Sequence, residues 1–121
     1  MKVLCADDEP DIRLILELAL RLDPSIEAEI VESGEEVLER VQRQKYDLIV
    51  LDGSMPGLDG YETCTQLKAD PATADVPVVF LTANTQRYQR ERALACGAVA
   101  TITKPFDPMT LAADLHAAML A

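Results

Sequence analysis

The stretch Leu48-Ile49-Val50-Leu51-Asp52 is a run of four large apolar residues that stops at an acid. It is short and continuously apolar, which is typical of a strand buried on both faces of a parallel sheet. A second run of this kind covers residues 78–81 and stops at Thr82. We therefore expect a parallel sheet, with Asp52 at the end of a central strand.

Two further apolar runs stop at polar residues in the same way. Residues 3–6 precede Asp7 and Asp8, and residues 99–103 precede Lys104. The carboxyl ends of parallel strands meet at one edge of a sheet, and open α/β sheets bind ligands in the crevice there. If the four runs belong to one sheet, acids, a hydroxyl and an ammonium group from nearly the whole chain share one pocket.

Short apolar runs alternate with longer helical patterns along the chain, which predicts an α/β fold of five βα units, (βα)5, with helices on both faces of the sheet. The second strand alternates polar and apolar residues, which favours an edge position. The expected strands cover residues 2–7, 27–31, 47–52, 77–82 and 99–103, and the expected helices cover residues 10–22, 34–44, 60–69, 86–96 and 108–120. We see no repeat or linker and expect one domain over residues 1–121.

Local signals indicate where several helices begin and end. Ser33, followed three residues later by Glu36, predicts a capping box at the second helix. Asp107 before Pro108 predicts an N-cap with proline at the first helical position. Gly97 is expected to end the fourth helix.

Composition excludes several classes of function. The chain has 121 residues, 49% of them apolar, which favours one folded domain over disorder. The net charge is -10, and residues 1–62 carry 16 acids against 6 bases, whereas residues 63–121 carry five of each. Because phosphate-backbone binding needs the opposite sign, we expect no direct nucleic-acid partner.

The chain shows no targeting or membrane signal. No apolar stretch approaches the roughly 20 residues that a spanning helix needs, and no signal peptide is apparent. The three cysteines, at positions 5, 64 and 96, have no C-x-x-C spacing, so we expect buried or half-buried free thiols. A cytoplasmic location without membrane insertion follows as our expectation.

Carboxylates at Asp7, Asp8 and Asp52 would repel one another at the sheet edge unless a cation lay among them. Hard oxygen ligands in an open site suit Mg²⁺, with Mn²⁺ as an alternative. Lys104 and Thr82 would add a cation and a hydroxyl donor that can meet phosphate oxygens. These residue types indicate phosphoryl transfer to a carboxylate, with Asp52 as the nucleophile.

In this order, the motifs resemble the receiver domains of two-component response regulators over essentially the whole chain. The chain is similar to the single-domain chemotaxis type. The matching segments are Asp7-Asp8, Asp52-x-x-Met55-Pro56-Gly57-x-Asp59-Gly60, Thr82-Ala83 and Lys104-Pro105-Phe106. The resemblance implies a flavodoxin-like, doubly wound sandwich with strand order 2-1-3-4-5.

The resemblance also implies a signalling role rather than an enzyme. Asp52 would accept phosphate from a sensor histidine kinase or a histidine phosphotransfer protein, and the domain would assist its own phosphorylation and dephosphorylation. The chain could be a complete regulator or the receiver of a larger hybrid kinase or effector protein. A monomer and a phosphorylation-dependent dimer both fit this family.

The ligands of the pocket follow from the same resemblance. Asp8, Asp52 and the backbone carbonyl of Ser54 would bind Mg²⁺, and Asp7 would act through a metal-bound water. The phosphoryl group would be held by three further groups, which are Thr82, Lys104 and the backbone N–H of Ala83. The Lys104–Pro105 peptide bond is expected to be cis.

The sequence departs from the family pattern three residues before Lys104. Receivers usually place a Tyr or Phe there, and this chain has Thr101, which cannot bury comparable aromatic area. We expect the output surface to respond in another way or only slightly. Ser54 and Asn84, each two residues beyond a pocket residue, are expected to tune dephosphorylation.

Two surfaces are candidates for partner binding. The first helix carries an apolar arc of roughly 240°, wider than a surface helix needs. Leu14 and Leu18 are the apolar residues of this helix in excess of what its packing needs. They form either a docking patch for a helical phosphodonor or part of a helix seated deeper than usual against its neighbour. The fourth helix carries Arg87, Tyr88, Arg90 and Arg92, whose three arginines form a basic cluster. This cluster is either a solvated helix face or part of the surface of the fourth helix, fifth strand and fifth helix.

Three other functions are less consistent with the sequence. A phosphatase of the haloacid-dehalogenase type would need a second acid two residues after Asp52, where this chain has Ser54. A P-loop switch would need a Gly-x-x-x-x-Gly-Lys-[Ser/Thr] segment, which does not occur. An interaction or scaffold module without phosphate control stays open as the alternative.

Overall fold

The computed structural model describes residues 1–83 and 87–120, without the side chains of residues 87 and 88. Each predicted strand and helix is present, with ends displaced by at most a few residues. The strands are β1 (Lys2–Ala6), β2 (Glu27–Val31), β3 (Leu48–Asp52), β4 (Val78–Thr82) and β5 (Ala100–Thr103), and the helices are α1 (Pro10–Arg21), α2 (Gly34–Arg43), α3 (Gly60–Ala69), α4 (Arg87–Ala95) and α5 (Leu111–Met119).

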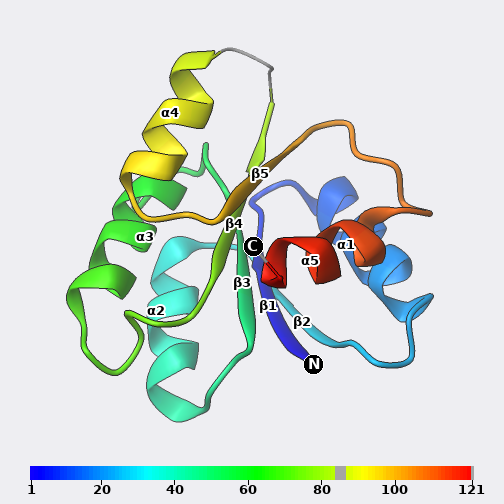
Figure 1. The fold of residues 1–121 in the computed structure, drawn as a ribbon, viewed down its shortest axis with the longest axis horizontal. Helices are drawn as coiled ribbons and strands as arrows, with labels where there is room; N and C mark the ends of the chain where they lie inside the picture. Colours follow the sequence, from blue (N-terminus) through cyan, green and yellow to red (C-terminus); the bar gives the residue numbers. More distant parts are fainter. Residues whose placement is uncertain (84–86, 121) are drawn as a thin grey trace.

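The strands form one parallel sheet in the order β2-β1-β3-β4-β5. This confirms the predicted α/β, flavodoxin-like topology, with β2 at an edge and β3 in the centre. In Figure 1, α1 and α5 cover one face of the sheet, and α2, α3 and α4 cover the other. The strand that ends at Asp52 is therefore covered on both faces, which explains its continuous apolar run.

Alternate residues of each central strand enter two separate cores. On β3, Ile49 and Leu51 pack with α2, α3 and α4, whereas Leu48 and Val50 pack with α1 and α5. All five residues of β3 are buried. Asp52, at the end of this strand, is therefore held in position by packing on both sides.

The helix ends correct two details of the sequence analysis. The helix expected from Pro108 begins at Leu111, because the Asp107 carboxylate accepts a hydrogen bond from Met109 N and makes a separate turn before the helix. At α2, Ser33 Oγ accepts from Glu36 N, but the Glu36 carboxylate accepts from Glu32 N rather than completing a capping box. Gly97, at φ 99°, does follow the end of α4.

The surplus apolar residues of α1 lie at the surface. Leu14 and Leu18 are 57% and 53% exposed, whereas Leu16 and Leu20 are fully buried. The alternative of a helix seated unusually deep is therefore wrong. Cys5 and Cys64 are buried and Cys96 is half-buried, all three as free thiols. Among the described residues, no helix combines the length and apolar character needed to cross a bilayer.

Candidate phosphoacceptor site

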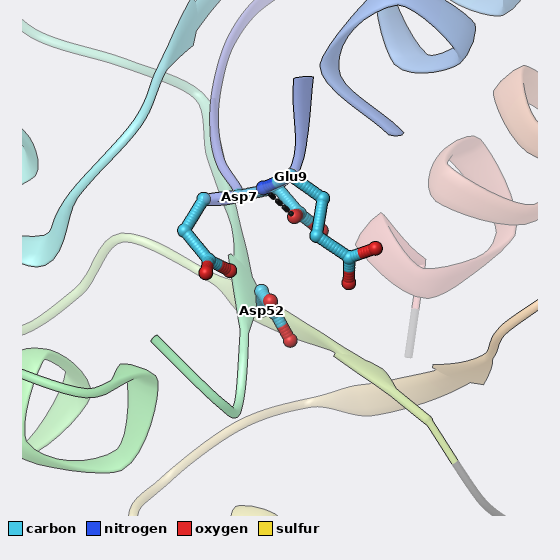
Figure 2. A group of neighbouring side chains, drawn as sticks. Asp7, Glu9 and Asp52 are labelled. Atoms are coloured by element: carbon cyan, nitrogen blue, oxygen red, sulfur yellow. Dashed lines mark hydrogen bonds between the residues drawn. The ribbon is translucent and has the colours of Figure 1, made fainter. Parts of the chain in front are cut away.

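The carboxyl ends of four strands bring the predicted polar residues to one edge of the sheet. Asp52 and Thr82 are the last residues of β3 and β4, and Lys104 directly follows β5. Asp7 follows β1, and Figure 2 shows its side chain beside those of Asp52 and Glu9. Residues separated by almost a hundred positions thus form one cluster.

Lys104 is the cation at the centre of this cluster. Its Nζ lies 2.7 Å from Asp7 Oδ2, 3.3 Å from Asp52 Oδ2 and 3.7 Å from Glu9 Oε1. Its backbone N–H donates to the carbonyl of Thr82 over 2.7 Å, which fixes the end of β5 against β4. The Lys104–Pro105 peptide bond is cis, as the resemblance implies.

Backbone groups orient the two most buried acids. Asp7 Oδ1 accepts from Glu9 N at 2.9 Å, and Asp52 Oδ1 accepts from Ser54 N at 3.1 Å. Asp7 and Asp52 are 0% and 3% exposed. Each carboxylate therefore keeps one oxygen on the backbone and turns the other toward Lys104.

Gly60 permits the close approach of α3 to the end of β3. A Cβ atom at this position would lie 2.2 Å from the carbonyl oxygen of Asp52, far inside van der Waals contact. The Gly60 of the sequence motif thus has a packing role, because only glycine lets α3 begin against the strand end. Asp59, just before it, caps α3 in a complete capping box with Glu62.

Burial and charge change the protonation of the cluster. Burial is the largest cause that raises the pKa of Asp52, from 3.8 to about 6, and the charge of Asp7 adds to it. The Ser54 N–H and Lys104 act in the opposite direction. Burial alone would lower the pKa of Lys104, but hydrogen bonding to Asp7 and the charge of Asp52 outweigh it and raise that pKa. The single positive charge of Lys104 therefore does not balance the negative charges of the acids around it.

The acids fit a divalent cation. Asp7, Asp8, Glu9 and Asp52 each offer a carboxylate oxygen, and these atoms lie within 4.8 Å of one another. Such a set of hard oxygen donors suits Mg²⁺. Glu9 was missed in the sequence analysis, although its place directly after Asp7 and Asp8 was a signal that could have identified it.

A cavity of about 310 Å³ opens beside Asp52 on the α4 side. Thr82 and Ala83 line it, together with Ser54 at its rim. Thr82 Oγ1 is buried and has no hydrogen-bond partner among the described residues. A buried hydroxyl without a protein partner is costly, so a water or a bound group is needed to satisfy it.

The other predicted residues lie outside the cluster. Thr101 is half-buried on β5, opposite Phe80 of β4 in the sheet register. Arg90 is exposed on α4. Asn84 and the side chains of Arg87 and Tyr88 lie outside the part of the chain that the structure describes. The structure therefore leaves their predicted roles untested.

Two residues of the cavity wall were not placed in the pocket from sequence, although Arg92 was counted in the basic cluster of the fourth helix. Arg92 and Tyr61 both line the cavity, and the Arg92 guanidinium stacks on the Tyr61 ring. No spacing rule relates residue 61 to residue 92, because the contact depends on how α3 and α4 pack on the sheet.

Comparison with known proteins agrees with this geometry. The model of the family described as response regulator receiver domain matches residues 3–116. The phosphate regulon transcriptional regulatory protein PhoB of Pseudomonas aeruginosa is 39% identical over 119 residues, which are 97% of this chain and 51% of that protein. The transcriptional regulatory protein ResD of Bacillus subtilis is 36% identical over 88% of this chain and 43% of its own.

Solved structures resemble the chain over nearly its whole length. The chemotaxis response regulator CheY4 of Vibrio cholerae superposes with a TM-score of 0.89 at 31% identity, covering 97% of both chains. The receiver domain of a sensor histidine kinase from Pseudomonas aeruginosa, solved with a magnesium ion in its active site cleft, has a TM-score of 0.88 at 29% identity and covers 99% of this chain and 98% of its own. The chain spans about half the length of the curated relatives it matches.

Proposed function

The chain belongs to the family of response regulator receiver domains, and on that premise we propose that it is a signalling switch activated by phosphorylation of Asp52. Members of this family act in two-component signalling rather than as conventional enzymes. The observation that carries the proposal is the cavity lined by both Asp52 and Thr82. Asp52 is buried there 3.3 Å from Lys104 Nζ, and the buried Thr82 hydroxyl has no partner among the described residues.

The proposed reaction transfers a phosphoryl group from a phosphohistidine to Asp52. An Asp52 carboxylate oxygen attacks the phosphorus and a P–O bond forms as the P–N bond breaks. The electron pair of the broken bond stays on the imidazole nitrogen, which takes up a proton from water. Lys104 and Thr82 would then hold the phosphoryl oxygens together with the backbone N–H of Ala83. This assignment explains why a buried hydroxyl at the end of β4 has no partner among the described residues.

We assign Mg²⁺ to the acidic side of the cluster. Asp8, Asp52 and the carbonyl of Ser54 would bind it directly, with Asp7 acting through a water and Glu9 close enough to contribute. The ion would neutralise charge that develops during transfer. Support comes from the donor set and from the magnesium ion in the cleft of the similar kinase receiver. Mn²⁺ suits the same ligands.

The proposed phosphodonor is a sensor histidine kinase or a histidine phosphotransfer protein. Leu14 and Leu18, exposed on α1, the helix that begins directly after the acidic cluster, would dock its helices by apolar contact. We also place the domain in the cytoplasm with this donor, since free thiols such as those of the three cysteines are usual in a reducing compartment.

The proposed output surface is the face of α4, β5 and α5. Arg90 lies on α4, and Arg87 and Tyr88 are assigned to the same surface from the sequence. Thr101 stands there in place of the usual aromatic residue. Ser54, exposed at the cavity rim, and Asn84 would set the lifetime of the phosphoryl group. The curated relatives regulate transcription as proteins about twice this length, so an effector role belongs to whatever this domain is joined to or binds.

Mass spectrometry after incubation with acetyl phosphate and Mg²⁺ tests the proposal. We expect one added phosphoryl group in the native protein and none in Asp52→Asn. Asp59→Asn is the matched control, since it makes the same charge change in the same cavity and asparagine is an equally good N-cap. Equal labelling of Asp52→Asn and the native protein would assign the phosphoryl group to another residue, and no labelling of the native protein would support the scaffold alternative.

A further inference from the structure

The Tyr61 ring lies between the sheet core and a cation. One side of the ring stacks on Phe80 of β4, with centroids 4.9 Å apart and planes 17° apart. The Arg92 guanidinium lies over the same ring, with its central carbon 4.1 Å from the centroid of the Tyr61 ring. Tyr61 is buried, whereas Arg92, on α4, is exposed. The ring is therefore a fixed platform, and the arginine is the partner with freedom to move.

This stacked pair separates two hollows between α3 and α4. The first is the cavity of about 310 Å³ that contains Asp52 and Thr82. The second, of about 340 Å³, lies farther along both helices and ends near Cys96. Because Arg92 and Tyr61 line both hollows, the arginine side chain borders the cavity of Asp52 as well as the second hollow.

Arg92 is the basic residue in the lining of the first cavity, as far as the side chains there are described. The acids in that lining are Asp52 and Asp59, and the Asp59 carboxylate already accepts the N–H of Glu62 at 2.8 Å. A phosphoryl group on Asp52 adds negative charge and strong acceptor oxygens to this space. A charge-assisted hydrogen bond to such oxygens is stronger than an exposed cation–π contact.

We propose that Arg92 is a further phosphoryl-binding residue, which stacks on Tyr61 in the unmodified protein and turns to the phosphoryl oxygens when Asp52 is modified. The inference rests on the proposed function of Asp52. Arginine suits this role because its planar fork binds both aromatic faces and phosphate. The move also couples the phosphoryl group to α4 directly, through a residue of that helix, without needing an aromatic side chain at Thr101.

Binding of beryllium fluoride, a phosphoryl mimic, in the presence of Mg²⁺ provides the test. We expect Arg92→Gln to weaken its binding about tenfold, the effect of losing one charge-assisted hydrogen bond. Arg92→Lys should restore part of this loss. Arg43→Gln is the charge-matched control, since Arg43 is exposed at the far end of α2, and its binding should equal that of the native protein.

Nitrogen-15 NMR of the arginine side chains gives a second readout, independent of stability. On addition of beryllium fluoride, the Arg92 Nε–H signal should shift and exchange its proton more slowly, and the Arg43 signal should not change. Unchanged Arg92 signals, or equal affinities for Arg92→Gln and Arg43→Gln, would overturn the inference. If the native protein itself binds no mimic, the proposed function of the site fails instead.

Discussion

Lys104 Nζ lies closer to Asp7 Oδ2, at 2.7 Å, than to the carboxylate of the proposed phosphoacceptor. In the unmodified protein the ammonium group is thus held mainly by an acid other than the proposed phosphoacceptor. Asp7 both positions the cation and adds negative charge beside Asp52. Titration of Asp52 detects the charge of Asp7 and its hold on Lys104, and it does so without any phosphoryl transfer.

Asp7→Asn should lower the pKa of Asp52 below its value of about 6 in protein without added metal. The substitution removes a charge that raises this pKa and releases Lys104 toward Asp52, so both changes act in one direction. Carbon-13 NMR of the Asp52 carboxyl group measures it. Asp8→Asn, at the half-buried neighbour, should produce the smaller shift. An unchanged or raised pKa in Asp7→Asn would contradict the assignment.

Asp52→Asn should stabilise the metal-free protein near pH 7.5 by about 1–2 kcal/mol. A pKa raised from 3.8 to about 6 means that, between these values, the folded protein keeps a proton that the unfolded chain has lost. Stability is therefore lost as the pH rises through this range, by at most about 3 kcal/mol for two pKa units, and the lost contact with Lys104 offsets part of the gain.

Urea unfolding at pH 4 and pH 7.5 checks this expectation. The stabilisation by Asp52→Asn should largely disappear at pH 4, where the native Asp52 is protonated. Asp75→Asn, which removes one exposed acid, should have little effect at either pH. Mg²⁺ should stabilise the native protein more than Asp52→Asn, because a ligand stabilises the state that binds it.

Thr82→Val should leave the unmodified protein as stable as before, or more stable by up to about 1 kcal/mol, because the buried hydroxyl has no partner among the described residues. The matched control is Thr73→Val. Thr73 is equally buried, but its hydroxyl donates to the Leu67 carbonyl at 2.7 Å, so this change should cost about 1 kcal/mol.

Thermal unfolding measures the difference in stability between the two variants, and labelling by acetyl phosphate measures their phosphorylation. Phosphorylation should slow in Thr82→Val and continue normally in Thr73→Val. A destabilised Thr82→Val protein would mean that its hydroxyl already has a partner in the unmodified state.

Leu14→Lys should reduce phosphotransfer from the cognate histidine donor about tenfold or more, because a charge replaces an exposed apolar contact residue at the docking surface. Labelling by acetyl phosphate should stay unchanged. Leu94→Lys is the matched control, since Leu94 on α4 is 55% exposed and Leu14 is 57% exposed. Equal loss with both phosphodonors would indicate folding damage rather than loss of docking.

Thr101→Tyr should alter partner binding more than it alters phosphorylation. The site of the substitution lies on β5, opposite Phe80 in the register and outside the phosphoacceptor cluster. A tyrosine there would add aromatic area at a position of the output face where this chain has a small polar side chain. Phosphotransfer assays and pull-down with the native partner compare the two effects, and equal changes in both would count against a separate output function for this position.

The sequence by itself determined the five βα units and most residues of the site, and the resemblance to a family added the strand order. Continuous apolar runs indicated doubly covered parallel strands, and a polar residue at the end of each run placed Asp52, Thr82 and Lys104 at one edge, because parallel strands end together. Local patterns were less reliable at helix starts. Asp107 looked like the cap of α5 but closes a separate turn, since its carboxylate reaches Met109 instead.

Only the tertiary structure decided how these groups meet. Three features depend on distances between chain segments remote in sequence. They are the preference of Lys104 for Asp7, the burial of the Thr82 hydroxyl without a described partner, and the burial that raises the pKa of Asp52. The contact of Arg92 with Tyr61 depends in the same way on the packing of α3 and α4 on the sheet. Strand periodicity sets which residues reach an edge, whereas side-chain packing sets which atoms touch there.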